Sequence, residues 1–282
     1  MIVLSFILLV LLNKDLIITK PMAGIIVGSF LVLAFGLLDD IKKLSWRTQL
    51  FFQTIIAAAA ISLGVKSDYI ASPLGEVINL ENPILYLTLY VLYFLLFMNA
   101  LNWLDGVDGL SGGVTFVALT IVFALSFKPE VNQPAVAILC AIGGGAVAGF
   151  LFYNFSPARI LAGTSGAMFF GFILASLSIF AGAKIATVLM VTIIPILDLL
   201  SVVWERYASG RSIFFGDRGR HLHFKLLKLG MSERKIAFVI CSASALMGIL
   251  ALRASQIEKI IIVVLFSAGY FWFLNGFLKQ KI

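Results

Sequence analysis

Carboxylate and amide side chains recur at short spacing in two segments of the sequence. The pair Asp39 and Asp40 ends one apolar run, and the segment Asn99–Gly113 begins with Asn or Asp at every third position and contains no Lys or Arg. On a helix, that spacing forms one polar stripe. Oxygen donors without basic neighbours suit a hard cation such as Mg²⁺, or the donor edge of a sugar or base. Taken alone, the pair is as typical of a charged membrane edge, and Asp-Gly and Gly-Gly are also common turn signals.

Two further segments carry groups that bind anions. Asn154–Gly166 ends in a Gly-Thr-Ser-Gly turn at the start of an apolar run, where hydroxyls and helix N-terminal amides favour an anion. The longest polar connection places both histidines, His221 and His223, beside Arg218 and Arg220, and arginine binds phosphate in a bidentate manner. Taken alone, the first is explained by a capping turn, and the second by a basic loop with incidental His or an anionic-lipid patch. Together the four segments predict a site for a metal and a diphosphate.

The elements that position these residues must be membrane helices, because the composition excludes other classes. The 282 residues are 61% hydrophobic and 12% charged, and the mean hydropathy is +1.06. A soluble domain has about 45–50% apolar and about 25% charged residues, and a disordered chain is less apolar still. Cys140 and Cys241 lie in apolar runs and have no disulfide-framework or zinc-site spacing. The net charge of +7 fits loops facing anionic lipid better than a nucleic-acid partner.

Ten apolar runs approach the roughly 20 residues that a helix needs to cross a bilayer. A turn or a kink would both fit the junction at Gly182–Lys184, and a kink reduces the count to nine. We therefore predict an all-α, polytopic membrane helix bundle of about ten transmembrane helices, forming a single domain over residues 1–282, with its largest cytoplasmic loop at 204–235. The runs are approximately 1–18, 22–38, 49–65, 83–101, 113–127, 134–153, 160–182, 184–203, 236–253 and 259–278.

The distribution of basic residues predicts which way the bundle faces. Alternating spans place 14 Lys and Arg on one side and 7 on the other. The positive-inside rule makes the richer side cytoplasmic. All four polar segments lie on that side, so we expect a multi-pass protein of the inner or plasma membrane with a cytoplasmic active site.

The order of the motifs resembles that of one family. Asp39-Asp40 follows a span, Asn99–Leu110 reads N-x-x-N-x-x-D-G-x-D-G-L, and Asn154–Gly163 reads N-F-x-P-A-R-x-x-x-G. Pro195–Asp198 then reads P-I-x-D, and Asp217–His223 contains D-R followed by H-L-H. Over essentially the whole chain this order resembles the polyprenyl-phosphate N-acetylhexosamine-1-phosphate transferases of the glycosyltransferase 4 family.

The resemblance implies an activity and its partners. The expected reaction transfers a sugar 1-phosphate, N-acetylglucosamine 1-phosphate above all, from a UDP-sugar to a polyprenyl phosphate such as undecaprenyl phosphate, and releases UMP. The expected process is the synthesis of cell-envelope polysaccharide. The resemblance also implies Mg²⁺ as the cofactor, with Mn²⁺ as the alternative, no nucleic-acid partner, and an assembly for which a homodimer is one option.

The resemblance assigns residue roles by motif position. Asp39 is the expected base for the lipid phosphate, Asp40 its partner and His221 the third catalytic residue, and we expect neither aspartate to be a buried structural partner. Asn102 and Thr164 are the expected metal ligands. Among the expected substrate-binding residues, Asp108 would contact the uracil, Asp105 would support its loop, and an arginine beside His221 would hold the pyrophosphate. The whole substrate-binding set is Asn99, Asp105, Asp108, Asn154, Arg218, Arg220 and His223.

Three features depart from the family pattern. The G-D-x-G-S motif is replaced here by Gly163–Ala167, so Thr164 stands in place of a metal-ligating aspartate, and Phe224 stands where H-x-H-H has its last histidine. The family also has a span and a P-R-x-G-G loop before the region that matches Met1, so we expect an N-terminally truncated chain. These departures keep open a degenerate relative that binds polyprenyl phosphate or nucleotide without turnover. A transporter is less favoured, because the acids gather at the membrane edge and not at mid-span.

Overall fold

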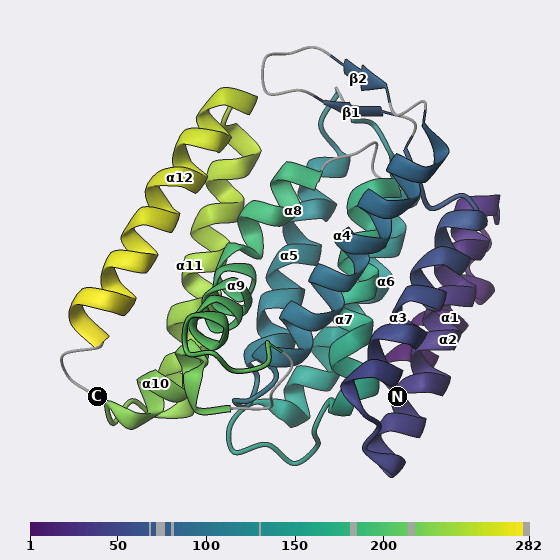
Figure 1. Cartoon of the computed structure of the whole chain (residues 1–282). Helices are drawn as coiled ribbons and strands as arrows, with labels where there is room; N and C mark the ends of the chain where they lie inside the picture. Colours follow the sequence, from purple (N-terminus) through teal and green to yellow (C-terminus); the bar gives the residue numbers. More distant parts are fainter. Residues whose placement is uncertain are drawn as a thin grey trace.

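The chain is wound almost entirely into helices (Figure 1). The structure, a computed structural model, describes residues 1–67, 69–71, 77–79, 82–129, 131–180, 185–213 and 218–278. A two-stranded antiparallel hairpin, β1 (Tyr69–Ala71) with β2 (Val77–Asn79), is the one departure from an all-α fold in these ranges. The helices are α1 (Ile2–Leu12), α2 (Lys20–Lys42), α3 (Trp46–Ser62), α4 (Pro83–Leu104), α5 (Leu110–Ser126), α6 (Pro134–Asn154), α7 (Gly163–Phe180), α8 (Ile185–Val191), α9 (Ile193–Ala208), η1 (Arg218–Arg220), α10 (Leu222–Lys228), α11 (Glu233–Arg253), α12 (Gln256–Trp272) and η2 (Phe273–Leu278).

Each of the ten predicted apolar runs lies on a helix, but the predicted number of transmembrane helices is not confirmed. Six helices of the described residues are long and apolar enough to cross a membrane, or seven if α8 and α9 count as one span. Those two helices are bent by 75°. Helix α1 has 11 residues and α5 has 17, which at about 1.5 Å per residue is short of the apolar core of a bilayer. The junction at Gly182–Lys184 lies outside the described residues.

Helix α7 forms the centre of the bundle. It packs against α2, α4 and α5, and its side chains Phe169, Phe170 and Phe172 are fully buried. Helix α12 is the opposite case, because only 11% of its most apolar window is buried and Leu265 and Trp272 face outward. An apolar outer surface is the one that lipid solvates, so the burial pattern agrees with a membrane protein.

The connections that carry the sequence motifs lie together at one end of the bundle, and the hairpin lies at the other (Figure 1). A close approach between α2 and α7 builds part of this end. A Cβ on Gly36 of α2 would lie 2.2 Å from the Cα of Ser165, so only glycine permits the two helices to touch here. The contact places the carboxyl end of α2, with its two aspartates, against the amino end of α7.

Candidate active site

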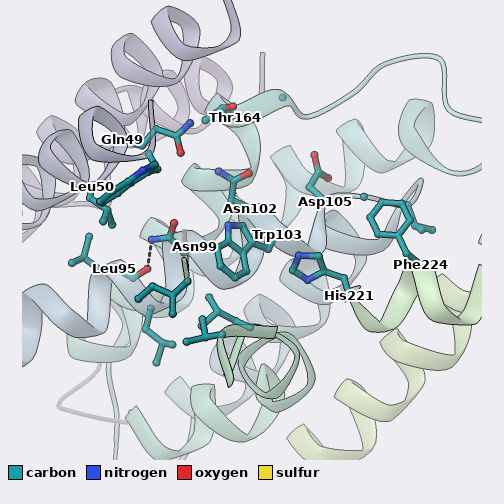
Figure 2. A pocket seen from close by; sticks show the side chains of 18 of the residues that line it. Gln49, Leu50, Leu95, Asn99, Asn102, Trp103, Asp105, Thr164, His221 and Phe224 are labelled. Atoms are coloured by element: carbon teal, nitrogen blue, oxygen red, sulfur yellow. Dashed lines mark hydrogen bonds between the residues drawn. The ribbon is translucent and has the colours of Figure 1, made fainter. Parts of the chain in front are cut away.

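A cavity of about 990 Å³ opens among these connections. Figure 2 shows its polar wall, on which Gln49, Asn102, Asp105, Thr164 and His221 are presented by different parts of the chain. Four of the segments singled out in the sequence therefore meet at one cavity.

Asp40 lines this cavity and caps the amino end of α7. One of its carboxylate oxygens accepts a hydrogen bond from the backbone N–H of Thr164 at 2.7 Å. The other accepts from the N–H and the hydroxyl of Ser165, at 3.4 and 3.2 Å. The amide groups of a helix N-terminus stabilise a negative charge. Asp40 is thus an exposed carboxylate with a fixed orientation and access to the cavity.

Asp39 lies behind Asp40 and is only 5% exposed. Its Oδ1 accepts hydrogen bonds from the Leu44 N–H at 3.1 Å and from Gln49 Nε2 at 3.0 Å, and its Oδ2 accepts from the Thr164 hydroxyl at 2.7 Å. The prediction that neither aspartate is a buried structural partner is therefore wrong for Asp39. The reason is geometric, because consecutive residues at the end of a helix point about 100° apart and cannot both face one cavity.

Asn99 reaches the cavity wall one helical turn before Asn102 and is held by Gln53. Asn99 Nδ2 donates to Gln53 Oε1 at 2.7 Å, and Gln53 Nε2 donates back at 3.4 Å. Gln53 is fully buried and lies four residues from Gln49, so one face of α3 fixes both Asp39 and Asn99. Sequence reasoning missed these glutamines, although two amides at helical spacing in an apolar run are a usable signal.

Asp105 adds negative charge to the same wall. Its carboxylate accepts a hydrogen bond from the Ser111 hydroxyl. The pKa of Asp105 is raised to about 6, chiefly by burial and to a smaller extent by the charges of Asp108 and Asp40, while the bond from Ser111 lowers it. The repulsion among these carboxylates favours a cation in the cavity.

Asp108 and Asn154 join two loops at the edge of the cavity, which both residues also line. Asp108 Oδ2 accepts from the Ala158 N–H at 2.8 Å. Asn154 Oδ1 accepts from the Gly109 N–H at 3.0 Å, and its amide donates to the Ile160 carbonyl at 2.8 Å. The structure thus gives both residues a role in loop geometry, and their contact with a substrate stays a prediction.

His221 lines the cavity with an orientation fixed by Asp198. The Oδ2 atom of Asp198 lies 2.7 Å from His221 Nδ1, and its Oδ1 accepts from the Leu222 N–H at 2.6 Å. Both side chains are buried. Since Nδ1 faces the carboxylate, Nε2 is the nitrogen that a substrate can meet. Asp198 was part of a recognised motif but had no assigned role, although a lone acid inside an apolar run is itself a signal of function.

His223 packs behind His221 and is fully buried. The two rings are stacked with centroids 5.6 Å apart, and neither nitrogen of His223 has a hydrogen-bond partner. A Cβ on Gly106 would lie 2.4 Å from His223 Nε2, so the loop can pass this ring only with glycine there. Burial lowers the pKa of His223 to about 4. Its position fits packing better than the predicted contact with a substrate.

We expect acid to destabilise the protein through His223. The unfolded chain takes up a proton near pH 6.5, whereas the folded chain takes it up only near pH 4. Between these values the unfolded state binds more protons, so the free energy of unfolding falls by up to about 1.4 kcal/mol per pH unit as the pH decreases. Thermal unfolding in detergent at pH 7 and pH 5 should show a smaller loss for His223→Leu than for the unaltered protein. Equal losses would contradict this expectation.

Arg220 contacts helix α9 and is not among the described residues that line the cavity. Its Nη1 donates to the Glu205 carbonyl at 3.1 Å, and Lys225 Nζ lies 2.7 Å from Glu205 Oε1. These contacts fasten the loop to α9 and do not place Arg220 where a pyrophosphate in the cavity would lie. The side chain of Arg218 lies outside the described residues, so its predicted role stays a prediction.

The donor chemistry of the wall decides whether a metal fits. The described residues contain no group of three His, Cys, Asp or Glu side chains placed to hold an ion. The wall does offer oxygen donors from Asp40, Asn102 and Asp105. Mg²⁺ is commonly held by one or two carboxylates together with substrate phosphates. The residues therefore fit Mg²⁺ that shares its ligands with a phosphorylated substrate, whereas the Thr164 hydroxyl is already bonded to Asp39.

Comparison with known proteins gives a consistent result. The model of the glycosyl transferase family 4 matches residues 22–182. A probable undecaprenyl-phosphate N-acetylglucosaminyl 1-phosphate transferase of Bacillus subtilis is 30% identical over 226 residues, which is 78% of this chain and 62% of that protein. A decaprenyl-phosphate N-acetylglucosaminephosphotransferase of Mycobacterium leprae is 29% identical over 81% of this chain and 63% of that protein.

A relative with a different substrate name also matches. The phospho-N-acetylmuramoyl-pentapeptide-transferase of Clostridium beijerinckii is 27% identical over 83% of this chain and 76% of that protein. The chain spans less than two thirds of the length of the Bacillus and Mycobacterium relatives.

Proposed function

This chain belongs to glycosyl transferase family 4, and from that premise we propose that it transfers a sugar 1-phosphate from a UDP-sugar to a polyprenyl phosphate and releases UMP. N-acetylglucosamine 1-phosphate is the proposed group, since the names of the Bacillus and Mycobacterium relatives specify N-acetylglucosamine. The proposed process is the synthesis of cell-envelope polysaccharide. The proposed location is the inner or plasma membrane, with the cavity facing the cytoplasm as the positive-inside rule predicts.

The observation that carries this proposal is that one cavity joins a polar wall to an apolar one. On α4, Leu92, Leu95 and Leu96 lead along the wall to Asn99. Other apolar wall residues come from α9, which passes the same cavity. An acceptor with a long hydrocarbon chain and a phosphate head meets both kinds of wall, whereas a water-soluble acceptor has no use for the apolar one.

The chemistry proposed for the site follows from which groups face the cavity. A bond forms between an oxygen of the acceptor phosphate and the phosphorus that carries the sugar, and the bond from that phosphorus to UMP breaks. Asp40 accepts the proton of the acceptor phosphate, because its carboxylate faces the cavity and Asp39 does not. His221, held by Asp198, donates from Nε2 to a phosphate oxygen of the UDP-sugar.

Mg²⁺, with Mn²⁺ as the alternative, is the proposed cofactor, and Asp40, Asn102 and Asp105 are the residues that would hold it. Bound there, the ion would neutralise charge on the phosphate oxygens. The accumulation of carboxylates without a lysine on the described wall supports this proposal.

Thr164 is the observation that favours a second candidate function, a relative that binds the lipid phosphate or nucleotide without turnover. Its hydroxyl occupies the position that an aspartate has in the family motif, and it donates to Asp39. A screen with UDP-N-acetylglucosamine and UDP-N-acetylmuramoyl-pentapeptide, undecaprenyl phosphate and Mg²⁺ separates the two. Lipid-dependent release of UMP supports the transferase, and nucleotide binding without UMP release supports the second candidate.

Replacing Thr164 by aspartate should make the protein depend on a divalent cation for stability. A carboxylate at this position would lie against Asp39, whose Oδ2 is now 2.7 Å from the hydroxyl, and like charges in contact repel each other. We expect Thr164→Asp to unfold at a lower temperature in EDTA and to recover in Mg²⁺. Thr164→Val, which removes only the hydroxyl, should show a smaller loss and no recovery in Mg²⁺. An unfolding temperature of Thr164→Asp that does not respond to Mg²⁺ would contradict the proposed location of the ion.

A further inference from the structure

The cavity wall carries three carboxylates and, among the described residues that line it, one side chain of the Lys or Arg type. The carboxylates belong to Asp40, Asp105 and Asp108, and the cation is Arg206. Arg206 lies in the last turn of α9 and is 3% exposed. A phosphorylated substrate that enters a cavity with this many carboxylates needs a protein cation near its phosphate, because buried like charges repel strongly.

Trp103 holds the guanidinium of Arg206 in place. The Cζ atom of Arg206 lies 4.9 Å from the centroid of the indole ring, which is a cation–π contact, and Nη1 donates to the Ile213 carbonyl at 2.8 Å. Stacking uses the face of a guanidinium and does not consume the N–H donors in its plane. The orientation of Arg206 is therefore set by an aromatic neighbour that leaves its charge in the cavity wall.

The same indole also contacts His221. The ring centroids of Trp103 and His221 are 5.4 Å apart at an interplanar angle of 74°, an edge contact. Asp198 fixes His221 from behind. Arg206, Trp103 and His221 thus form a continuous part of the wall, shown around Trp103 in Figure 2.

The position of Arg206 on α9 indicates which substrate it meets. Leu199, Val203 and Arg206 all line the cavity and are spaced four and three residues apart, so they lie on one face of the helix. An apolar stripe thus ends at a cation. A lipid phosphate has the same order, a hydrocarbon followed by an anion.

On the basis of the proposed transferase function, we propose that Arg206, stacked on Trp103, binds a phosphoryl group in the cavity, namely that of the acceptor lipid. Trp103 is a positioning residue in this arrangement, and Arg206 makes the contact. The sequence motif placed this role on Arg218 or Arg220, but Arg220 is engaged with Glu205 on α9.

The test measures lipid binding without any donor. Purified protein in detergent is titrated with undecaprenyl phosphate and, as the matched neutral lipid, undecaprenol. Arg206→Gln should weaken binding of the phosphate about 10- to 100-fold, the range expected for losing a charge-assisted hydrogen bond, and should leave binding of the alcohol unchanged. Trp103→Leu should reproduce part of this loss, and Trp103→Phe, which keeps an aromatic face, should restore most of it.

Controls separate binding from folding. Lys228→Gln removes an exposed positive charge from the same end of the chain and should bind both lipids normally. If Arg206→Gln does not give a folded, monodisperse protein, Arg206→Lys keeps the charge and should show a smaller, phosphate-specific loss.

Each outcome has a distinct meaning. Equal loss of both lipids, or no loss of either, overturns the inference. If the affinity for undecaprenyl phosphate is unchanged and that for the UDP-sugar falls, the assignment to the acceptor is overturned. Because no donor is present, a protein that transfers no sugar phosphate but discriminates the two lipids through Arg206 supports this inference while the proposed function fails.

Discussion

Asp40→Asn should reduce sugar 1-phosphate transfer by about 10²- to 10⁴-fold, the range associated with loss of a general base. The amide cannot accept the proton of the acceptor phosphate, although it can still accept a hydrogen bond from the Thr164 N–H. We therefore expect kcat to fall and the unfolding temperature to change little. Asp15→Asn, a matched change at an exposed aspartate in the α1–α2 connection, should leave both quantities unchanged.

Asp39→Asn should behave differently, because this carboxylate is buried. Three donors point at its oxygens, and an amide would turn an N–H₂ group toward at least one of them. We expect a loss of stability of about 1–3 kcal/mol, the cost of leaving buried polar groups unsatisfied. A variant that folds normally and loses all activity, beside an active Asp40→Asn, would reverse the two roles.

Asp198→Asn should lower kcat about 10- to 100-fold, the range for losing a hydrogen bond to a charged group. Asp198 does not line the cavity; it fixes the ring of His221 and the first turn of α10. His221→Ala should lower the rate at least as much, and the double variant should be little worse than His221→Ala, since both changes remove one unit. Steady-state kinetics of the three variants measure this.

A comparison with His223 sharpens the test. His223→Leu should retain most of the activity, because His223 is not among the described residues that line the cavity. If the effects of Asp198→Asn and His221→Ala were additive, the two side chains would act separately and the pair would not be a functional unit.

The sequence predicts the helices well because long apolar runs bounded by polar turns are a strong signal. It does not predict where a run breaks. The run at 184–203 contains Thr192 between α8 and α9, and a β-branched residue of this kind is common in unbroken helices too. The 75° bend that brings α9 past the cavity depends on tertiary packing.

The site was predictable as a set of motifs and not as a set of contacts. Adjacent aspartates are visible in the sequence, but which of them faces the cavity depends on how α7 docks at Gly36. Asp198 and His221 are 23 positions apart, so nothing local in the sequence pairs them. Likewise, the basic loop offers several arginines, and only the path of α9 places Arg206 on the wall.

The central claim, that this cavity moves a sugar together with its phosphate, is tested most directly by following the phosphorus. Purified protein is incubated with undecaprenyl phosphate, Mg²⁺ and UDP-N-acetylglucosamine labelled with ³²P in the β-phosphate. We expect the label to appear in the lipid extract in step with the release of UMP, and to be absent from the extract when Asp40→Asn is used. Label that stays in the nucleotide while sugar enters the lipid, or no labelled lipid with any active preparation, would contradict the account.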